Sequence, residues 1–133
     1  MKKVLILCTG NSCRSIIAEA IINKELKNKV EAFSSGVKAS GKVNPNAKKV
    51  LEKYDCWDDR YHSKTIDEVI DIDFDLVVTV CDNAKENCPI FPKKIKVVHI
   101  GFEDPDGKDY SEFEKTFHLI KDQLLSKIGK QLL

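Results

Sequence analysis

Short apolar runs alternate with amphipathic segments from one end of the chain to the other. Apolar runs bounded by turn residues are typical of buried strands, and apolar residues spaced three or four apart are typical of helices. The predicted strands are residues 3–7, 30–34, 76–80 and 95–100. The predicted helices are residues 15–26, a segment that begins at Pro45 behind an Asn44 N-cap, a short segment capped by Thr65, and residues 111–128.

Strands that alternate with helices predict an α/β fold with a four-stranded parallel sheet and helices on both of its faces. The chain has 133 residues and neither a linker nor a repeat, so we expect one domain over residues 1–133. In such sheets ligands bind beyond the carboxyl ends of the strands. Cys8 and Cys81 each follow a predicted strand, so we expect both to face the same crevice.

Composition narrows the function classes. A net charge of +1 with interleaved signs does not favour a nucleic-acid or membrane-surface partner. No run approaches the ~18 apolar residues that a transmembrane helix needs. The apolar run after Lys3 is too short for a signal peptide, and no small-residue cleavage site follows it. We therefore expect a cytoplasmic protein, and a monomer, since no exposed apolar seam is evident.

The chain has five cysteines, and cytoplasmic chains rarely carry structural disulfides. They are Cys8, Cys13, Cys56, Cys81 and Cys88. The first pair is separated by four residues and the last by six, unlike the two-residue spacing of most zinc sites, and no histidine lies beside them. The sequence thus predicts inert or redox-active thiols rather than a metal site.

Cys8 opens the run CTGNSCRS between a predicted strand and a predicted helix. A helix N-terminus attracts anions and stabilises thiolates, and the small turn residues allow their N–H groups to converge. Arg14 offers a planar fork for two oxygens of a tetrahedral anion. The candidate oxyanion-binding residues are Thr9, Gly10, Asn11, Ser12, Cys13, Arg14 and Ser15. The alternative, a buried cysteine before an ordinary helix cap, explains the flanking pattern less well.

Two further residues have an ordinary interpretation beside the chemical one. The Ser15 hydroxyl group either donates to the Cys8 thiolate or belongs only to the first helical turn. Asp104 either acts as a general acid toward an oxygen leaving group or forms a turn before Pro105. Considered alone, the Asp-Pro pair favours the turn.

Cys81 and Cys88 bracket a polar segment that ends at Pro89. In a helix, residues seven apart lie on one face but about 10 Å apart along the axis, which is too far for a disulfide. The two thiols therefore bond only if the segment unwinds, which its Asn, Asp and Pro residues make inexpensive. The spacing alone fits two unrelated cysteines equally well.

The CTGNSCRS run resembles the phosphate-binding loop of the low-molecular-weight protein tyrosine phosphatase fold. The rest of the chain, from Lys3 to about residue 125, resembles one branch of that fold, the thioredoxin-coupled arsenate reductases. The supporting runs are residues 43–47, 75–81, 88–90, 101–105 and 107–108. The loop identifies the fold, and the Cys81 and Cys88 pair selects the reductase branch.

This resemblance implies a mechanism. Cys8 attacks arsenate held by the loop and Arg14, while Asp104 protonates the departing oxygen. Cys81 then attacks the Cys8 sulfur, which releases arsenite and leaves a Cys8–Cys81 disulfide. Cys88 converts it to a Cys81–Cys88 disulfide, which thioredoxin reduces without a cofactor.

The resemblance also draws attention to a potassium site. Some of these reductases bind potassium through an Asn and a Glu at the positions of Asn11 and Glu19. A loop at the position of residues 63–65 completes that site, but the carboxylate expected at its end is absent here. The sequence therefore argues against potassium dependence. We assign no role to Cys56, and we interpret the three histidines, His62, His99 and His118, as packing or surface residues.

Two alternatives remain open. A tyrosine or small-molecule phosphatase would use Cys8, Arg14 and Asp104, but it makes Cys81 and Cys88 bystanders. The aromatic pair that such phosphatases often place after Asp-Pro is replaced here by Asp106 and Gly107. The second alternative is a phosphocysteine carrier or a non-catalytic redox sensor; a carrier would keep Cys8 but would not need Arg14 with Asp104 and two further thiols.

Overall fold

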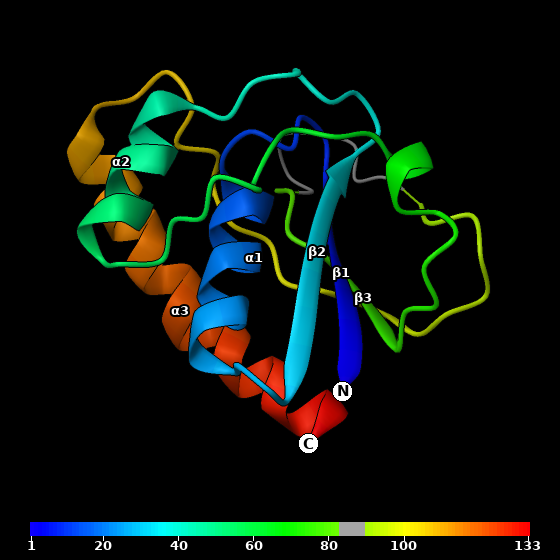
Figure 1. Ribbon diagram of the computed structural model, residues 1–133. Coiled ribbons are helices and arrows are strands. Elements are labelled where there is room, and N and C mark those ends of the chain that lie inside the picture. Colours follow the sequence, from blue (N-terminus) through cyan, green and yellow to red (C-terminus); the bar gives the residue numbers. More distant parts are fainter. Residues whose placement is uncertain (83–89) are drawn as a thin grey trace.

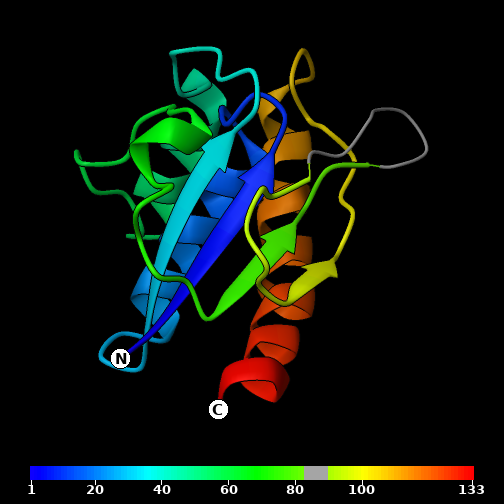
Figure 2. The same ribbon diagram turned by 90° about the vertical axis from the view of Figure 1, so that its right-hand side faces the viewer.

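The computed structural model describes residues 1–82 and 90–133; Cys88 and the rest of segment 83–89 lie outside the described residues. The described strands are β1 (Lys2–Cys8), β2 (Val30–Gly36), β3 (Leu76–Thr79) and β4 (Val97–His99). They form one parallel sheet in the order β2-β1-β3-β4, which Figure 2 shows side by side. The described helices are α1 (Arg14–Glu25), α2 (Pro45–Lys53), the 3-10 helix η1 (Ile66–Glu68) and α3 (Tyr110–Leu132).

The central strand β1 is buried on both faces, as expected for a parallel sheet. Val4 and Ile6 pack into the larger apolar cluster with the three α-helices, whereas Leu5 and Leu7 pack into a smaller cluster on the opposite face. Figure 1 shows α1, α2 and α3 on one side of the sheet and η1 on the other. The predicted α/β fold is confirmed, with an uneven distribution of helices in the described part of the chain.

Element boundaries differ from the predictions at the edge of the sheet and at the C-terminal helix. The strand predicted over residues 95–100 is observed only over Val97–His99, and two of its three residues are exposed. An edge strand with so little burial gains less from extended pairing than a central strand does. The C-terminal helix is longer than predicted because its apolar face continues to Leu132 against the main cluster.

Helix α1 lies between the sheet and α3, and its residues from Arg14 to Ile22 are all buried. This burial includes polar residues of its first turns, notably Ser15 and Glu19. Buried polar side chains require hydrogen-bond partners, so α1 must carry a polar network on the side where it meets the end of β2. None of the described helices is long and apolar enough to cross a membrane.

Strands β1 and β2 end at the same level, where Cys8 pairs with Gly36. A Cβ atom at Gly36 would lie 2.5 Å from the Thr9 carbonyl oxygen, closer than real contacts allow. The Gly36 N–H group also donates to the Lys64 carbonyl group at 3.0 Å. Glycine at this position therefore lets the loop after β1 pack closely against the end of β2, which itself pairs with the chain at Lys64 and Thr65.

Candidate active site

The loop that joins β1 to α1 lines a cavity of about 260 Å³ at the carboxyl end of the sheet. Cys8, the last residue of β1, is only 3% exposed, and α1 begins at Arg14. The lining residues are Cys8, Thr9, Gly10, Asn11, Ser12, Cys13, Arg14, Ser40, Asp104 and Asp106. The structure thus brings together every predicted oxyanion residue except Ser15, together with Asp104.

The carbonyl groups of the loop are bonded to the chain around it. Those of Thr9, Gly10 and Ser12 accept N–H groups of Lys38, Ser40 and Asn44 at 2.9–3.0 Å, and that of Cys13 accepts Ile17 N–H. In a trans peptide the N–H group points opposite to the carbonyl group, and the described chain has no cis bond. The N–H groups that follow these carbonyls therefore point away from the partners of the carbonyl groups, in a loop whose residues line the cavity. This arrangement suits a tetrahedral anion.

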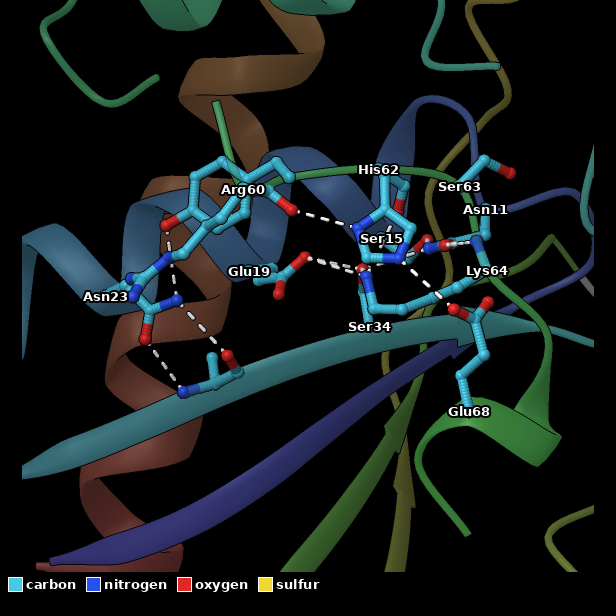
Figure 3. Close-up of polar contacts among 12 residues, drawn as sticks. Asn11, Ser15, Glu19, Asn23, Ser34, Arg60, His62, Ser63, Lys64 and Glu68 are labelled. Atoms are coloured by element: carbon cyan, nitrogen blue, oxygen red, sulfur yellow. Dashed lines mark hydrogen bonds and ion pairs between the residues drawn. The ribbon is translucent and has the colours of Figure 1, made fainter. Parts of the chain in front are cut away.

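Asn11 holds the loop in shape from within. It is fully buried and has a φ of 49°, in the left-handed region that asparagine tolerates better than most residues. Its Nδ2 donates to the hydroxyl groups of Ser15 at 2.8 Å and Ser34 at 3.0 Å. Its Oδ1 accepts the Lys64 N–H group at 2.8 Å. Figure 3 shows these side chains gathered above the end of β2.

Ser15 lies behind the loop and is fully buried. Because its oxygen accepts a hydrogen bond from Asn11, its own hydroxyl hydrogen remains available for another acceptor. The network therefore orients Ser15 as a donor, which the predicted bond to the Cys8 thiolate requires. That bond stays a prediction.

Arg14 and Asp104 form an ion pair in the lining of the cavity. The Arg14 side chain is 3% exposed, and its Nη1 donates to the Phe102 carbonyl group at 3.1 Å. Its Nη2 lies 3.5 Å from Asp104 Oδ2, and Asp104 is 47% exposed. Asp104 Oδ1 also accepts the Asp106 N–H group at 3.0 Å. Asp104 therefore forms a turn and lines the cavity at the same time. Both interpretations of the Asp-Pro pair are compatible with this geometry.

Cys81 is fully buried just beyond β3 and is not among the residues that line the cavity. The Val80 N–H group donates to the Leu7 carbonyl group at 3.1 Å, so the chain leaves β3 beside the strand that ends in Cys8. A Cβ atom at Gly101 would lie 3.1 Å from the Cys81 carbonyl oxygen, so glycine there allows the chain after β4 to approach Cys81 closely. The predicted partner Cys88 lies outside the described residues.

The other described cysteines differ from Cys8 in their surroundings. Cys8, Cys13 and Cys56 are not in disulfides. Burial raises the pKa of Cys13 to about 12, an effect that its contact with the Ser12 hydroxyl group at 3.6 Å only partly offsets. Burial also raises the pKa of Cys56. Neither thiol is therefore ionised at neutral pH, which agrees with the absence of an assigned role for Cys56.

Four residues of this region received no role in the sequence analysis: Ser34, Ser40, Lys64 and Asp106. Asp106 lies two residues after Asp104 in the sequence, so its place in the lining follows from that of Asp104. Ser40 and Ser34 lie in segments without a distinctive local pattern. Lys64 is 7% exposed, and a buried lysine is rare enough that sequence reasoning assigns such a residue to the surface.

Comparison with known proteins agrees with this geometry. The model of the low molecular weight phosphotyrosine protein phosphatase family matches residues 3–132. The chain is 42% identical over 129 residues to arsenate reductase 1 of Bacillus cereus, covering 97% of this chain and 92% of that protein. It is 39% identical over 127 residues to arsenate reductase 2 of Staphylococcus saprophyticus, covering 96% and 93%. The crystal structure of an arsenate reductase from Archaeoglobus fulgidus superposes with a TM-score of 0.84 at 32% identity, covering 95% and 98%.

Proposed function

This chain belongs to the low molecular weight phosphotyrosine protein phosphatase family, and we propose that it uses the anion-binding loop to reduce arsenate to arsenite. The observation that carries the proposal is the single cavity lined by Cys8, Arg14 and Asp104. Similarity over nearly the whole chain to proteins named arsenate reductase supports arsenate as the oxyanion.

In the first step, the Cys8 thiolate attacks the arsenic atom. The loop N–H groups and the Arg14 guanidinium bind the oxygens and neutralise their charge, an electrostatic contribution that is large inside a closed site. Asp104, at the rim 3.5 Å from Arg14, delivers a proton to the oxygen that leaves. The products of this step are water and a thiol–arsenate adduct on Cys8.

In the second step, the Cys81 thiolate attacks the Cys8 sulfur. The sulfur–arsenic bond breaks and its electron pair stays on arsenic, which leaves as arsenite, while Cys8 and Cys81 form a disulfide. Two thiols lose two electrons and arsenic(V) gains two, so the step balances without a cofactor. Cys88 then displaces Cys8, and the dithiol of thioredoxin reduces the Cys81–Cys88 disulfide by the same exchange chemistry.

The burial of Cys81 sets a requirement on this relay. Cys81 is disulfide-bonded in this structure, fully buried and outside the lining of the cavity, so it must be reduced and brought to Cys8 by a rearrangement before it can attack. The strand itself is tied to β1 up to Leu7 and Val80, so the rearrangement must begin beyond Val80.

Single-turnover experiments with cysteine variants test the proposal. Reduced protein is mixed with excess arsenate in the absence of thioredoxin, and arsenite is quantified together with the disulfide formed. The wild type and Cys88→Ser should each release one arsenite per chain, with a Cys8–Cys81 disulfide in the variant. Cys8→Ser and Cys81→Ser should release none, and Cys56→Ser serves as the matched control with wild-type yield. Repeated turnover by Cys88→Ser with thioredoxin as sole reductant would refute the relay.

We also propose an oligomeric state, a location and a protein partner for the enzyme. The enzyme acts as a monomeric domain over residues 1–133, in the cytoplasm, with thioredoxin as its protein partner. Cytoplasmic reductants keep thiols reduced, which the Cys8 nucleophile requires. Sedimentation in reducing buffer should give a species of 15.1 kDa, the mass of one chain.

A further inference from the structure

A buried polar cluster beneath the Cys8 loop contains a cation of its own. The Lys64 side chain is 8% exposed, and its ammonium nitrogen lies 3.7 Å from Glu19 Oε1, whose side chain is 7% exposed. The same nitrogen donates to the His62 carbonyl group at 3.0 Å and to Ser34 Oγ at 3.5 Å. Figure 3 shows the Lys64 side chain reaching between Glu19 and Ser34. A charge buried this deeply is stable only when it is paired and hydrogen-bonded, and these oxygens meet that condition.

The cluster is continuous with the oxyanion loop. Ser34 donates to Glu19 at 2.6 Å and accepts from Asn11 of the loop, so Ser34 joins the ion pair to the loop. The backbone N–H group of Lys64 also bonds directly to Asn11 Oδ1. Lys64 therefore bonds to Asn11 through its backbone N–H group. Its side chain also bonds to Ser34, which accepts a hydrogen bond from Asn11. Asn11 in turn fixes the left-handed turn of the loop and orients Ser15.

These residues do not fit a potassium ion. Asn11 and Glu19, the two positions that the family resemblance offers as ligands, already accept hydrogen bonds from Lys64 N–H and Ser34. A further cation beside Glu19 would meet the ammonium charge at short range, which is strongly unfavourable in a buried site. Burial raises the pKa of Glu19, and the Lys64 charge acts against that rise. Lys64 therefore already supplies the positive charge beside this carboxylate.

We propose that Lys64 is a positioning residue whose ammonium group replaces a bound monovalent cation, so that the anion affinity of the Cys8 loop is independent of potassium. The inference deepens the proposed function, since it rests on the Cys8 loop being the oxyanion site. An ammonium group and a potassium ion carry the same charge and are similar in size. Removing the side chain would leave a space bounded by the oxygens of Glu19, Ser34 and His62, and oxygen is the ligand that hard cations prefer.

Binding of inorganic phosphate tests this inference without any redox chemistry. Phosphate bound to the loop protects Cys8 from iodoacetamide, so the protection curve gives a dissociation constant. Each protein is compared in potassium chloride and in choline chloride at equal ionic strength, and its melting temperature is recorded in both. The proteins are the wild type, Lys64→Ala, the double variant Glu19→Gln with Lys64→Ala, and Lys42→Ala, which removes an exposed lysine as a matched control.

The wild type and Lys42→Ala should give the same dissociation constant and melting temperature in both salts. Lys64→Ala in choline should bind phosphate about tenfold more weakly, because it loses hydrogen bonds to charged groups beneath the loop. Potassium should restore most of that affinity and raise its melting temperature. In the double variant, which lacks the carboxylate, potassium should restore neither.

Three results would overturn the inference: a potassium-specific gain in the wild type, wild-type affinity of Lys64→Ala in choline, or a Lys64→Ala defect that potassium does not relieve. Should Lys64→Ala not fold in choline, Lys64→Met is measured instead, because its stem fills the same space. It should show the tenfold loss in both salts, and wild-type affinity would refute the proposal. Because no arsenate is reduced in these assays, their failure is distinct from failure of the relay.

Discussion

At the scale of single residues, the cysteines of the site differ in their chemistry because of their surroundings and not because of their spacing in the sequence. Cys8 and Cys13 both lie in the loop and are equally buried, at 3% exposure each. Cys13 lies at the N-cap of α1, and the net effect of its burial raises its pKa to about 12. Its thiol therefore stays protonated at neutral pH, which leaves Cys8 as the candidate nucleophile of the loop.

Alkylation as a function of pH tests this difference. A thiol with a raised pKa is protonated, and therefore unreactive, at any pH well below that value. At pH 7 iodoacetamide should modify Cys8 and leave Cys13 intact in the same peptide, which fragment-ion mass spectrometry distinguishes. Modification of Cys13 should begin only as the pH approaches about 12 or when the protein unfolds. Equal modification of both thiols at pH 7 would contradict the account.

At the scale of elements, helix termini hold the loops that surround the cavity. Helix α2 begins at Pro45 behind Asn44, whose side chain accepts the Asn46 N–H group at 2.8 Å, as the sequence predicted. The same side chain donates to Asp106 Oδ1 at 2.7 Å. The cap of one helix therefore also fixes the loop that carries Asp104. The Ser12 carbonyl group accepts Asn44 N–H, which completes the link to the Cys8 loop.

Replacing the cap should separate these two effects. Asn44→Ala should lower the free energy of unfolding by about 1 kcal/mol, because it leaves an N–H group of the first turn without its acceptor. Asn44→Ser should stay within a few tenths of a kcal/mol of the wild type, since serine caps equally well. Both variants lose the bond to Asp106, so both should bind phosphate more weakly. Urea unfolding measures the first effect and Cys8 protection the second; equal stability of all three proteins would contradict the assigned cap.

At the scale of the whole molecule, the periodicity of the chain predicted the sheet and its helices because burial dictates both. Strand β1 lies between two apolar clusters, so its uninterrupted apolar run was a reliable signal. The oxyanion loop was predictable for a similar reason, since its chemistry is carried by consecutive residues. Strand β4 was predicted too long because its exposure leaves little burial to fix its ends.

The remaining parts of the site depend on contacts between distant segments. Gly36 lies beyond the predicted strand over residues 30–34, and only the fold shows that the approach of Thr9 requires glycine there. Lys64 was passed over because nothing in its local sequence indicates that its ammonium group is buried against Glu19. Asp104 was ambiguous from its Asp-Pro pair, and its distance of 3.5 Å from Arg14 is a property of the fold. Local pattern thus predicted that Cys8 and the residues after it form one site at the end of β1, whereas the supporting network required the structure.

The most direct test of the central claim is NADPH oxidation in the presence of thioredoxin and thioredoxin reductase, measured with and without arsenate. The account predicts continuous arsenate-dependent oxidation by the wild type and none by Cys8→Ser. No arsenate-dependent oxidation by a wild type that still hydrolyses an aryl phosphate would contradict it, and would make the protein a phosphatase whose Cys81 and Cys88 take no part in the reaction.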